Sequence, residues 1–207
     1  PLRRSSRLAA LISAIGASIF LSNLALLIMG SQPYNFPSPF ETKVYQTSLF
    51  IISRVEIIVL LSSFVLMIGL TFFVQKTKIG KAMRATAQDK DTASLMGINI
   101  NKIVTITFAI GSALGAAAGA MVGIYFRTVT PAMGLMPALK GFVAAVLGGI
   151  GNIPGAMLGG ILLGIAEVMG AAYISSQYRD AVAFTLLIIV LLFKPAGLLG
   201  SPAQEKV

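Results

Sequence analysis

The chain has 207 residues, a mean hydropathy of +0.87, 56% hydrophobic residues and only 11% charged ones. A soluble domain carries roughly 25% charged residues, and apolar runs near twenty residues recur in this chain, so the composition indicates a membrane protein. The absence of Cys and His excludes disulfides, Cys- or His-based metal sites and a Ser-His-Asp triad, and we expect no catalytic residues and no metal site.

Six apolar segments follow one another along the chain. They predict an all-α integral membrane protein, a polytopic helix bundle with short broken helices and a cytoplasmic coupling loop, over residues 8–29, 55–74, 103–125, 142–150, 155–173 and 181–193. The fourth and sixth are short for a crossing, as happens where protein shields a helix or the helix lines a cavity. The start PLRRSSR is typical of a signal peptide, but the run after it is long enough to span, and Pro1 suggests the C-terminal part of something longer.

Lys and Arg set the expected orientation. The net charge of +9 is explained by cytoplasmic loops rather than by nucleic acid, and placing 75–102 in the cytoplasm puts eleven basic residues inside and five outside. Both chain ends are then cytoplasmic, and the outside loops are 30–54, 126–141 and 174–180. Three prolines in SQPYNFPSPF predict a stiff, solvated first loop. The inside set is Arg3, Arg4, Arg7, Lys76, Lys78, Lys81, Arg84, Lys90, Lys102, Lys194 and Lys206, and the outside set is Lys43, Arg54, Arg127, Lys140 and Arg179.

Glycines recur in the third apolar segment and again between the fourth and fifth, with a different spacing in each place. Glycines at 111, 115, 119 and 123 share one helix face, which favours close helix packing over a pore-lining groove. In VLGGIGNIPGAMLGG, over 146–160, glycine and proline break the helix, so the chain turns near 151–154. Two interpretations stay open: a tight cytoplasmic turn, or a broken element beside a transport path or gate. The candidate residues there are Gly149, Gly151, Asn152, Pro154 and Gly155.

Two acids lie inside the apolar segments, where charge is costly. Glu56 lies near a boundary, as an interfacial carboxylate does. Glu167 lies deeper, in GIAEVMG, and is added to the path or gate candidates, although a buried hydrogen bond between helices is the favoured interpretation.

The polar stretch GKAMRATAQDKDTASLMGIN separates two apolar segments. Its composition predicts two short helices at the membrane surface, the second capped by Asp89 or Asp91 and followed by Gly97. A positive anchor that touches nothing would explain the lysines, but not the alanines, the two Asp residues or the glycine stop.

This stretch resembles the cytoplasmic loop of permease subunits of ATP-binding-cassette importers, most closely the branched-chain amino-acid permeases of the Liv H type. FVAAVLGGIGNIPGAMLGG and FKPAGLLG are also similar to that family, and the resemblance covers most of the chain, strongly from Thr77 onward. Further spans usually precede the region matching 8–29, so the resemblance implies one permease domain over 1–207 that is part of a longer permease. The implied ATPase-docking loop is 75–102, with the matching residues Gly80, Arg84, Ala85, Gln88, Asp89, Ala93, Gly97 and Ile98.

The resemblance also implies a mechanism and partners. Cytoplasmic ABC ATPase subunits hydrolyse ATP, and a second permease subunit completes the path through the lipid bilayer of a prokaryotic plasma membrane. An extracytoplasmic substrate-binding protein delivers Leu, Ile or Val to this path. The permease itself is then no enzyme and has no cofactor. No G-x-x-x-x-G-K-[ST] phosphate loop occurs in the chain.

Other functions stay open. A permease of the same superfamily for urea, other amino acids or sugars has the same fold by resemblance. An ion-driven secondary transporter needs intramembrane acids or an unwound ion site, for which Glu167 alone is thin support. A membrane scaffold needs neither a docking loop nor a broken helix.

Overall fold

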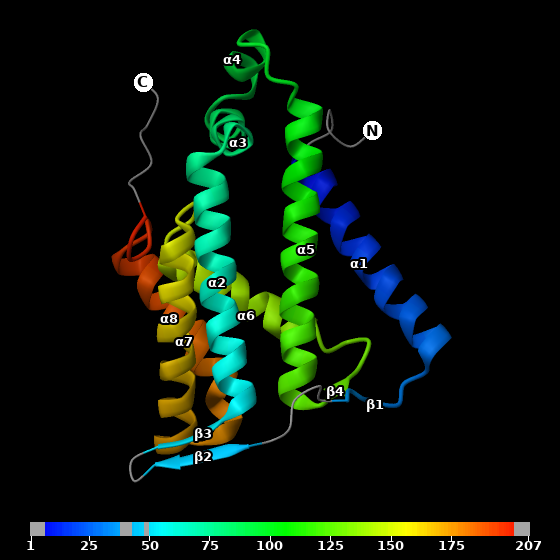
Figure 1. Ribbon diagram of the computed structural model, residues 1–207, viewed down its shortest axis with the longest axis vertical. Coiled ribbons are helices and arrows are strands. Elements are labelled where there is room, and N and C mark those ends of the chain that lie inside the picture. Colours follow the sequence, from blue (N-terminus) through cyan, green and yellow to red (C-terminus); the bar gives the residue numbers. More distant parts are fainter. Residues whose placement is uncertain (1–6, 38–42, 48–49, 201–207) are drawn as a thin grey trace.

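The computed structural model describes residues 7–37, 43–47 and 50–200. In these residues the six expected apolar segments are all helical, and the all-α membrane fold is confirmed (Figure 1). Five helical stretches are long and apolar enough to cross a membrane: Ile12–Met29, Arg54–Lys76, Ile100–Phe126, Ile153–Tyr173 and Ser176–Phe193. The long helices are α1 (Arg7–Met29), α2 (Arg54–Lys76), α5 (Ile100–Phe126), α6 (Leu135–Gly148), α7 (Ile153–Tyr173) and α8 (Arg179–Phe193), the last preceded by the short helix η2 (Ser176–Tyr178).

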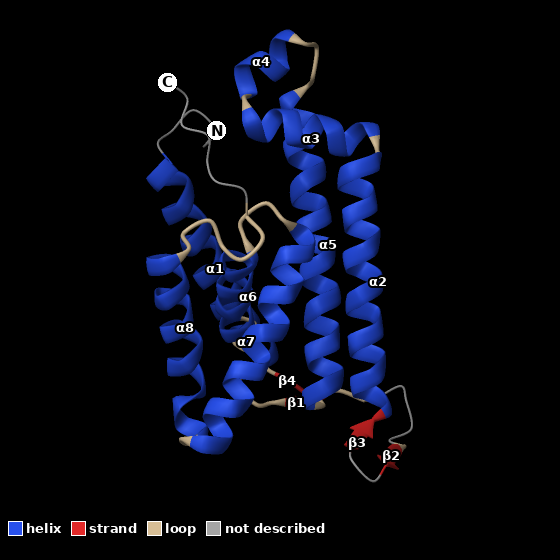
Figure 2. Cartoon of the chain, turned by 90° about the vertical axis from the view of Figure 1, so that its left-hand side faces the viewer, coloured by secondary structure: helices blue, strands red, loops and turns tan. Residues whose placement is uncertain are grey.

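The bundle has two distinct ends, which Figures 1 and 2 show at the top and bottom. At the loop end lie the two short helices α3 (Lys78–Gln88) and α4 (Lys90–Leu95). At the opposite hairpin end lie β1 (Tyr34–Asn35), β2 (Val44–Thr47), β3 (Phe50–Ser53) and β4 (Thr128–Val129).

The short strands were not expected from the sequence. β1 pairs antiparallel with β4, with Tyr34 opposite Val129, and β2 pairs antiparallel with β3, with Val44 opposite Ser53. The expected loop over 30–54 is therefore partly wrong, because its second half is a hairpin that leads directly into α2. Ser53 caps α2 by accepting from the Glu56 N–H, and the Glu56 carboxylate accepts from the Ser53 N–H in return.

Helix α6 differs most from its expected bounds. It begins at Leu135 and ends at Gly148, so half of the loop expected over 126–141 is helical. Fourteen residues rise roughly 21 Å, less than the roughly 30 Å of a hydrocarbon core. The second half of this short helix is buried against the core of the protein, whereas its first half is largely exposed. That core contains Val143, Ala144, Leu147, Leu163 and Ala183 from α6, α7 and α8.

Close helix packing occurs at a different place from the one expected. On α5, a Cβ added at Gly111, Gly115 or Gly119 would meet nothing within 4 Å, and the buried Gly123 packs against the side chains of Val129 and Phe36 rather than against another helix. The helix packing expected on this face is therefore not found among the described residues. Instead α6 and α7 meet at Gly148 and Gly155, where a Cβ on Gly155 would lie 2.5 Å from the Gly148 carbonyl oxygen. Small residues thus bring these two backbones together.

Candidate functional site

At the loop end, a single residue, Thr77, separates α2 from α3. Thr77 ends α2 and begins α3: its N–H and hydroxyl donate to the Phe73 carbonyl oxygen at 3.2 and 2.6 Å, and its hydroxyl accepts from the Gly80 N–H at 3.0 Å. A Cβ on Gly80 would overlap the carbonyl oxygens of Phe73 and Val74. Gly80, the first residue of the expected docking motif, is therefore required by the fold itself.

Asp89 connects the two short helices. Its backbone is extended, and its Oδ1 accepts from the N–H groups of Asp91 and Thr92 at 3.0 and 3.3 Å. Its Oδ2 accepts from the Thr92 hydroxyl at 2.9 Å. Of the two acids expected as possible caps, Asp89 is the one that caps α4.

The remaining motif residues complete α3 and α4. Ala85 is half-buried in α3, and Gln88, its last residue, is exposed. Ala93 is buried, and its carbonyl oxygen accepts from the Ile98 N–H at 3.1 Å. Gly97 has φ +82°, so it forms the expected glycine stop.

Two side chains at the tip of α4 were missed by the sequence analysis. Leu95 and Met96 are 88% and 79% exposed. Leu95 is the last residue of α4 and Met96 follows it, at the loop end that Figure 1 shows at the top. They lie between motif positions, so a pattern match passes over them. The detectable signal was an adjacent pair of large apolar residues in an otherwise polar stretch.

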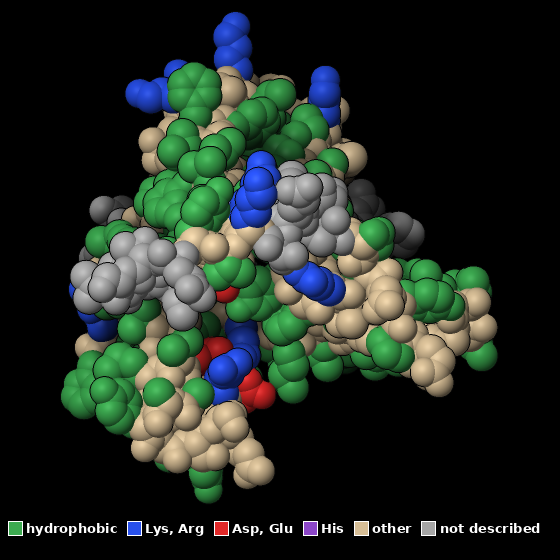
Figure 3. Space-filling view, turned by 60° about the horizontal axis from the view of Figure 1, so that its bottom comes forward, with side chains coloured by type: hydrophobic (Ala, Val, Ile, Leu, Met, Phe, Trp, Pro, Cys, Tyr) green, Lys and Arg blue, Asp and Glu red, His purple; other side chains and the backbone are tan. Residues whose placement is uncertain are grey.

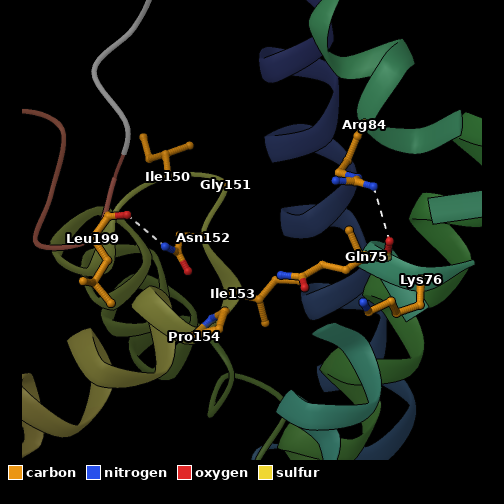
Figure 4. A pocket seen from close by; sticks show the side chains of 10 residues that line it. Gln75, Lys76, Arg84, Ile150, Gly151, Asn152, Ile153, Pro154 and Leu199 are labelled. Atoms are coloured by element: carbon orange, nitrogen blue, oxygen red, sulfur yellow. Dashed lines mark hydrogen bonds between the residues drawn. The ribbon is translucent and has the colours of Figure 1, made fainter. Parts of the chain in front are cut away.

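Arg84 faces the break between α6 and α7 across a cavity of about 510 Å³. Its guanidinium donates to the Gln75 carbonyl oxygen at 3.3 Å, on the wall formed by the end of α2 (Figure 4). The opposite wall includes Gly151, Asn152 and Pro154. The structure therefore brings together two groups of residues that the sequence analysis treated separately.

The break itself is a constrained turn. Gly149 and Gly151 have φ +112° and +91°, as expected for glycines that end a helix and redirect the chain. Asn152 caps α7 by accepting from the Gly155 N–H at 3.0 Å, and its amide donates to the Leu199 carbonyl oxygen at 2.8 Å. The FKPAGLLG tail is thereby attached to the turn, a contact that the sequence did not predict.

Glu167 does not belong to this group. It lies on α7 toward the hairpin end, where its Oε2 accepts from Lys140 of α6 at 3.0 Å. The favoured interpretation, a buried polar contact between helices, matches this geometry, and Glu167 does not line the cavity beside Arg84 and Gly151. Its place on a transport path or gate stays a prediction.

Comparisons with known proteins identify the chain as similar to transport permeases. The family described as "Branched-chain amino acid transport system / permease component" matches residues 5–191. The high-affinity branched-chain amino acid transport system permease protein BraD of Pseudomonas aeruginosa is 47% identical over 211 residues, which cover 100% of this chain and 69% of BraD. The corresponding LivH of Escherichia coli (strain K12) is 46% identical over 214 residues, covering 100% of this chain and 68% of LivH. The ribose import permease protein RbsC of Haemophilus influenzae is 30% identical over 128 residues, covering 58% of this chain and 40% of RbsC. No solved structure matches the chain.

Proposed function

Because the chain belongs to the family of branched-chain amino acid transport system permease components, we propose that it moves Leu, Ile or Val into a prokaryotic cell and that its loop end docks on an ATPase. It is a multi-pass membrane protein with transport permeases as relatives. In this proposal, partner ATPases hydrolyse ATP, a second permease completes the path, and a binding protein delivers the substrate.

The charge distribution supports a cytoplasmic loop end. Cytoplasmic loops are rich in Lys and Arg, and basic residues are concentrated around α3 and α4. These residues are Lys76, Lys78, Lys81, Arg84, Lys90 and Lys102.

The observation that carries the docking proposal is the exposed pair Leu95 and Met96. Large apolar side chains in a charged, water-facing region cost free energy unless a partner covers them. A membrane anchor would place such side chains toward the bilayer, whereas this pair lies where α4 ends, at the loop end of the bundle.

The geometry around Arg84 supports a coupling route. Helix α3 packs on α2 and α5, and the cavity beside Arg84 separates it from the α6–α7 turn. A movement of α3 driven by a docked partner would change the width of this cavity, and hence the contact between the docking surface and the bundle.

The test is a paired substitution in the full-length permease, expressed with its ATPase and binding protein. Leu95→Ser with Met96→Ser should abolish co-purification of the ATPase and ATP-dependent uptake of radiolabelled leucine, while membrane expression stays normal. The matched control is Tyr173→Ser with Ile174→Ser, an adjacent exposed apolar pair at the hairpin end, 84% and 69% exposed.

Three outcomes would contradict the proposal. Uptake and co-purification at the wild-type level in the Leu95/Met96 variant would show that the loop does not dock and serves only as a membrane anchor. Uptake that follows an ion gradient instead of ATP would identify a secondary transporter. Uptake of ribose or urea in place of leucine would reassign the substrate class.

A further inference from the structure

Three helices are joined at the hairpin end by one lysine. The Lys140 ammonium, on α6, contacts Glu167 Oε2 of α7 at 3.0 Å and Asp180 Oδ1 of α8 at 2.8 Å. Figure 3, which turns this end toward the viewer, shows acidic and basic side chains gathered at its centre between apolar surfaces. The Lys140–Glu167–Asp180 cluster fixes the charged groups in place before any ligand arrives.

One carboxylate oxygen in this cluster has no donor. Glu167 is 12% exposed, and its second oxygen, Oε1, is buried without a hydrogen-bond partner among the described residues. A buried, unpaired carboxylate oxygen is costly, so its presence calls for a donor from outside the chain. Lys140 donates to Oε2 and to Asp180 and leaves Oε1 without a donor.

A cation without an ion-pair partner lines the same cavity. Arg179 is the first residue of α8 and is exposed, and among the described residues the ion pairs at this end join Lys140 to Glu167 and Asp180 and leave Arg179 out. The start of a helix favours anions, so the helix itself does not hold this cation. The guanidinium is therefore available to bind a carboxylate in two-pronged fashion.

The cavity between these groups has about 440 Å³, within the roughly 300–1,000 Å³ range of small-molecule sites. Its other walls are mainly apolar side chains from the end of α5, the connection that follows it and the start of α6, together with two threonines of that connection. The apolar residues are Val122, Phe126, Met133, Met136 and Pro137, and the threonines are Thr128 and Thr130.

We propose that this cavity binds an α-amino acid with an aliphatic side chain. The ligand's ammonium donates to Glu167 Oε1, its carboxylate accepts from Arg179, and its side chain lies against the methionines and Phe126. A lone cation would leave Arg179 without an acceptor, and a sugar would set most of its hydroxyls against apolar walls, where only Thr128 and Thr130 offer further polar groups. The inference draws on the proposed function in one respect, that the ligand is of the same class as the transported substrate.

The test measures binding to the full-length permease, assembled with its partner subunits in nanodiscs without the binding protein. The probes are leucine, 4-methylpentanoate, which lacks the ammonium, and 3-methylbutylamine, which lacks the carboxylate. Arg179→Gln should weaken leucine binding by about tenfold or more and leave 3-methylbutylamine unchanged. Glu167→Gln should weaken leucine similarly and leave 4-methylpentanoate unchanged.

Matched controls exist at the same end of the molecule. Arg54→Gln removes an exposed cation outside the cavity, and Glu56→Gln removes an acid while glutamine preserves the capping box. Both should bind leucine as the wild type does. Equal leucine affinity in the wild type and in both cavity variants, or no leucine binding by the wild type, would overturn the site.

Uptake assays separate this inference from the proposed function. If ATP-dependent leucine uptake persists while both cavity variants bind leucine normally, the cavity claim fails and the proposed function stands. If the wild type binds leucine with the expected probe pattern yet shows no ATP-dependent uptake, the cavity claim stands and the proposed function fails.

Discussion

Arg84 and Gly151 lie on opposite walls of one cavity, although Arg84 belongs to the short helix α3 and Gly151 to the turn between α6 and α7. The sequence marked both residues, for unrelated reasons. A displacement of α3 toward this cavity would therefore bring Arg84 against the turn.

Gly151→Val tests the constraint in this turn. Its φ of +91° is unfavourable for a β-branched residue, although a side chain there has open space. We expect a cost of about 1–3 kcal/mol in stability from backbone strain, seen as a lower melting temperature of the purified protein. Gly164→Ala, on α7 and also facing open space, is the control. Unchanged stability and uptake in Gly151→Val would show that the turn is unconstrained.

Gly80→Ala should damage the junction between α2 and α3. The added methyl group collides with backbone carbonyl oxygens that have no freedom to move aside, which should cost about 1–3 kcal/mol or displace α3. Protease sensitivity of the loop end should rise. Gly111→Ala introduces the same methyl group into open space and should leave both stability and protease sensitivity unchanged.

Asp89→Ala should unfold α4 selectively. Removing the cap costs about 1 kcal/mol, so amide exchange at Asp91 and Thr92 should accelerate, while Asp89→Asn, which still accepts, should be close to wild type. Asp91→Ala is the control for loss of charge. Fast exchange in the Asp91 variant and slow exchange in the Asp89 variant would reverse the assignment. A charge swap at Arg84 and Asp89 is a poor docking test, because it also removes this cap.

Cysteine labelling tests the orientation, on a background without native cysteines. Tyr173→Cys, at the hairpin end, should react with an impermeant thiol reagent in intact cells. Leu95→Cys should react only after the membrane is opened. Thr86 would be a poor probe because it is buried, and Ser38 lies outside the described residues. Labelling of Leu95→Cys in sealed cells would place the loop end outside.

The helices were predictable because their signals are local. Apolar length indicated the long helices, and the Asp89 cap and the Gly97 stop follow from side-chain and backbone chemistry within a few residues. The pairing of Tyr34 with Val129, and of Asn152 with Leu199, joins segments far apart in the chain and leaves no local pattern.

The sequence identified single charged residues inside the bundle but not the ion pairs that they form. Glu167 was marked as a costly acid, but its partner Lys140 was assigned to an outside loop because α6 was expected to begin after it. The exposure of Leu95 and Met96 was not predictable, because the two residues lie between motif positions and the sequence does not show which side chains of a short surface helix face water.

The shared cap at Thr77 couples the orientation of α3 to that of α2. A flexible tether between α2 and α3 would absorb a push on the short helix through free backbone rotation. Here one residue's hydroxyl is bonded to both helices, and the Gly80 backbone lies directly against the carbonyl oxygens of Phe73 and Val74. A rotation of α3 is therefore transmitted directly to the spanning helix α2, and the two helices move as one rigid unit.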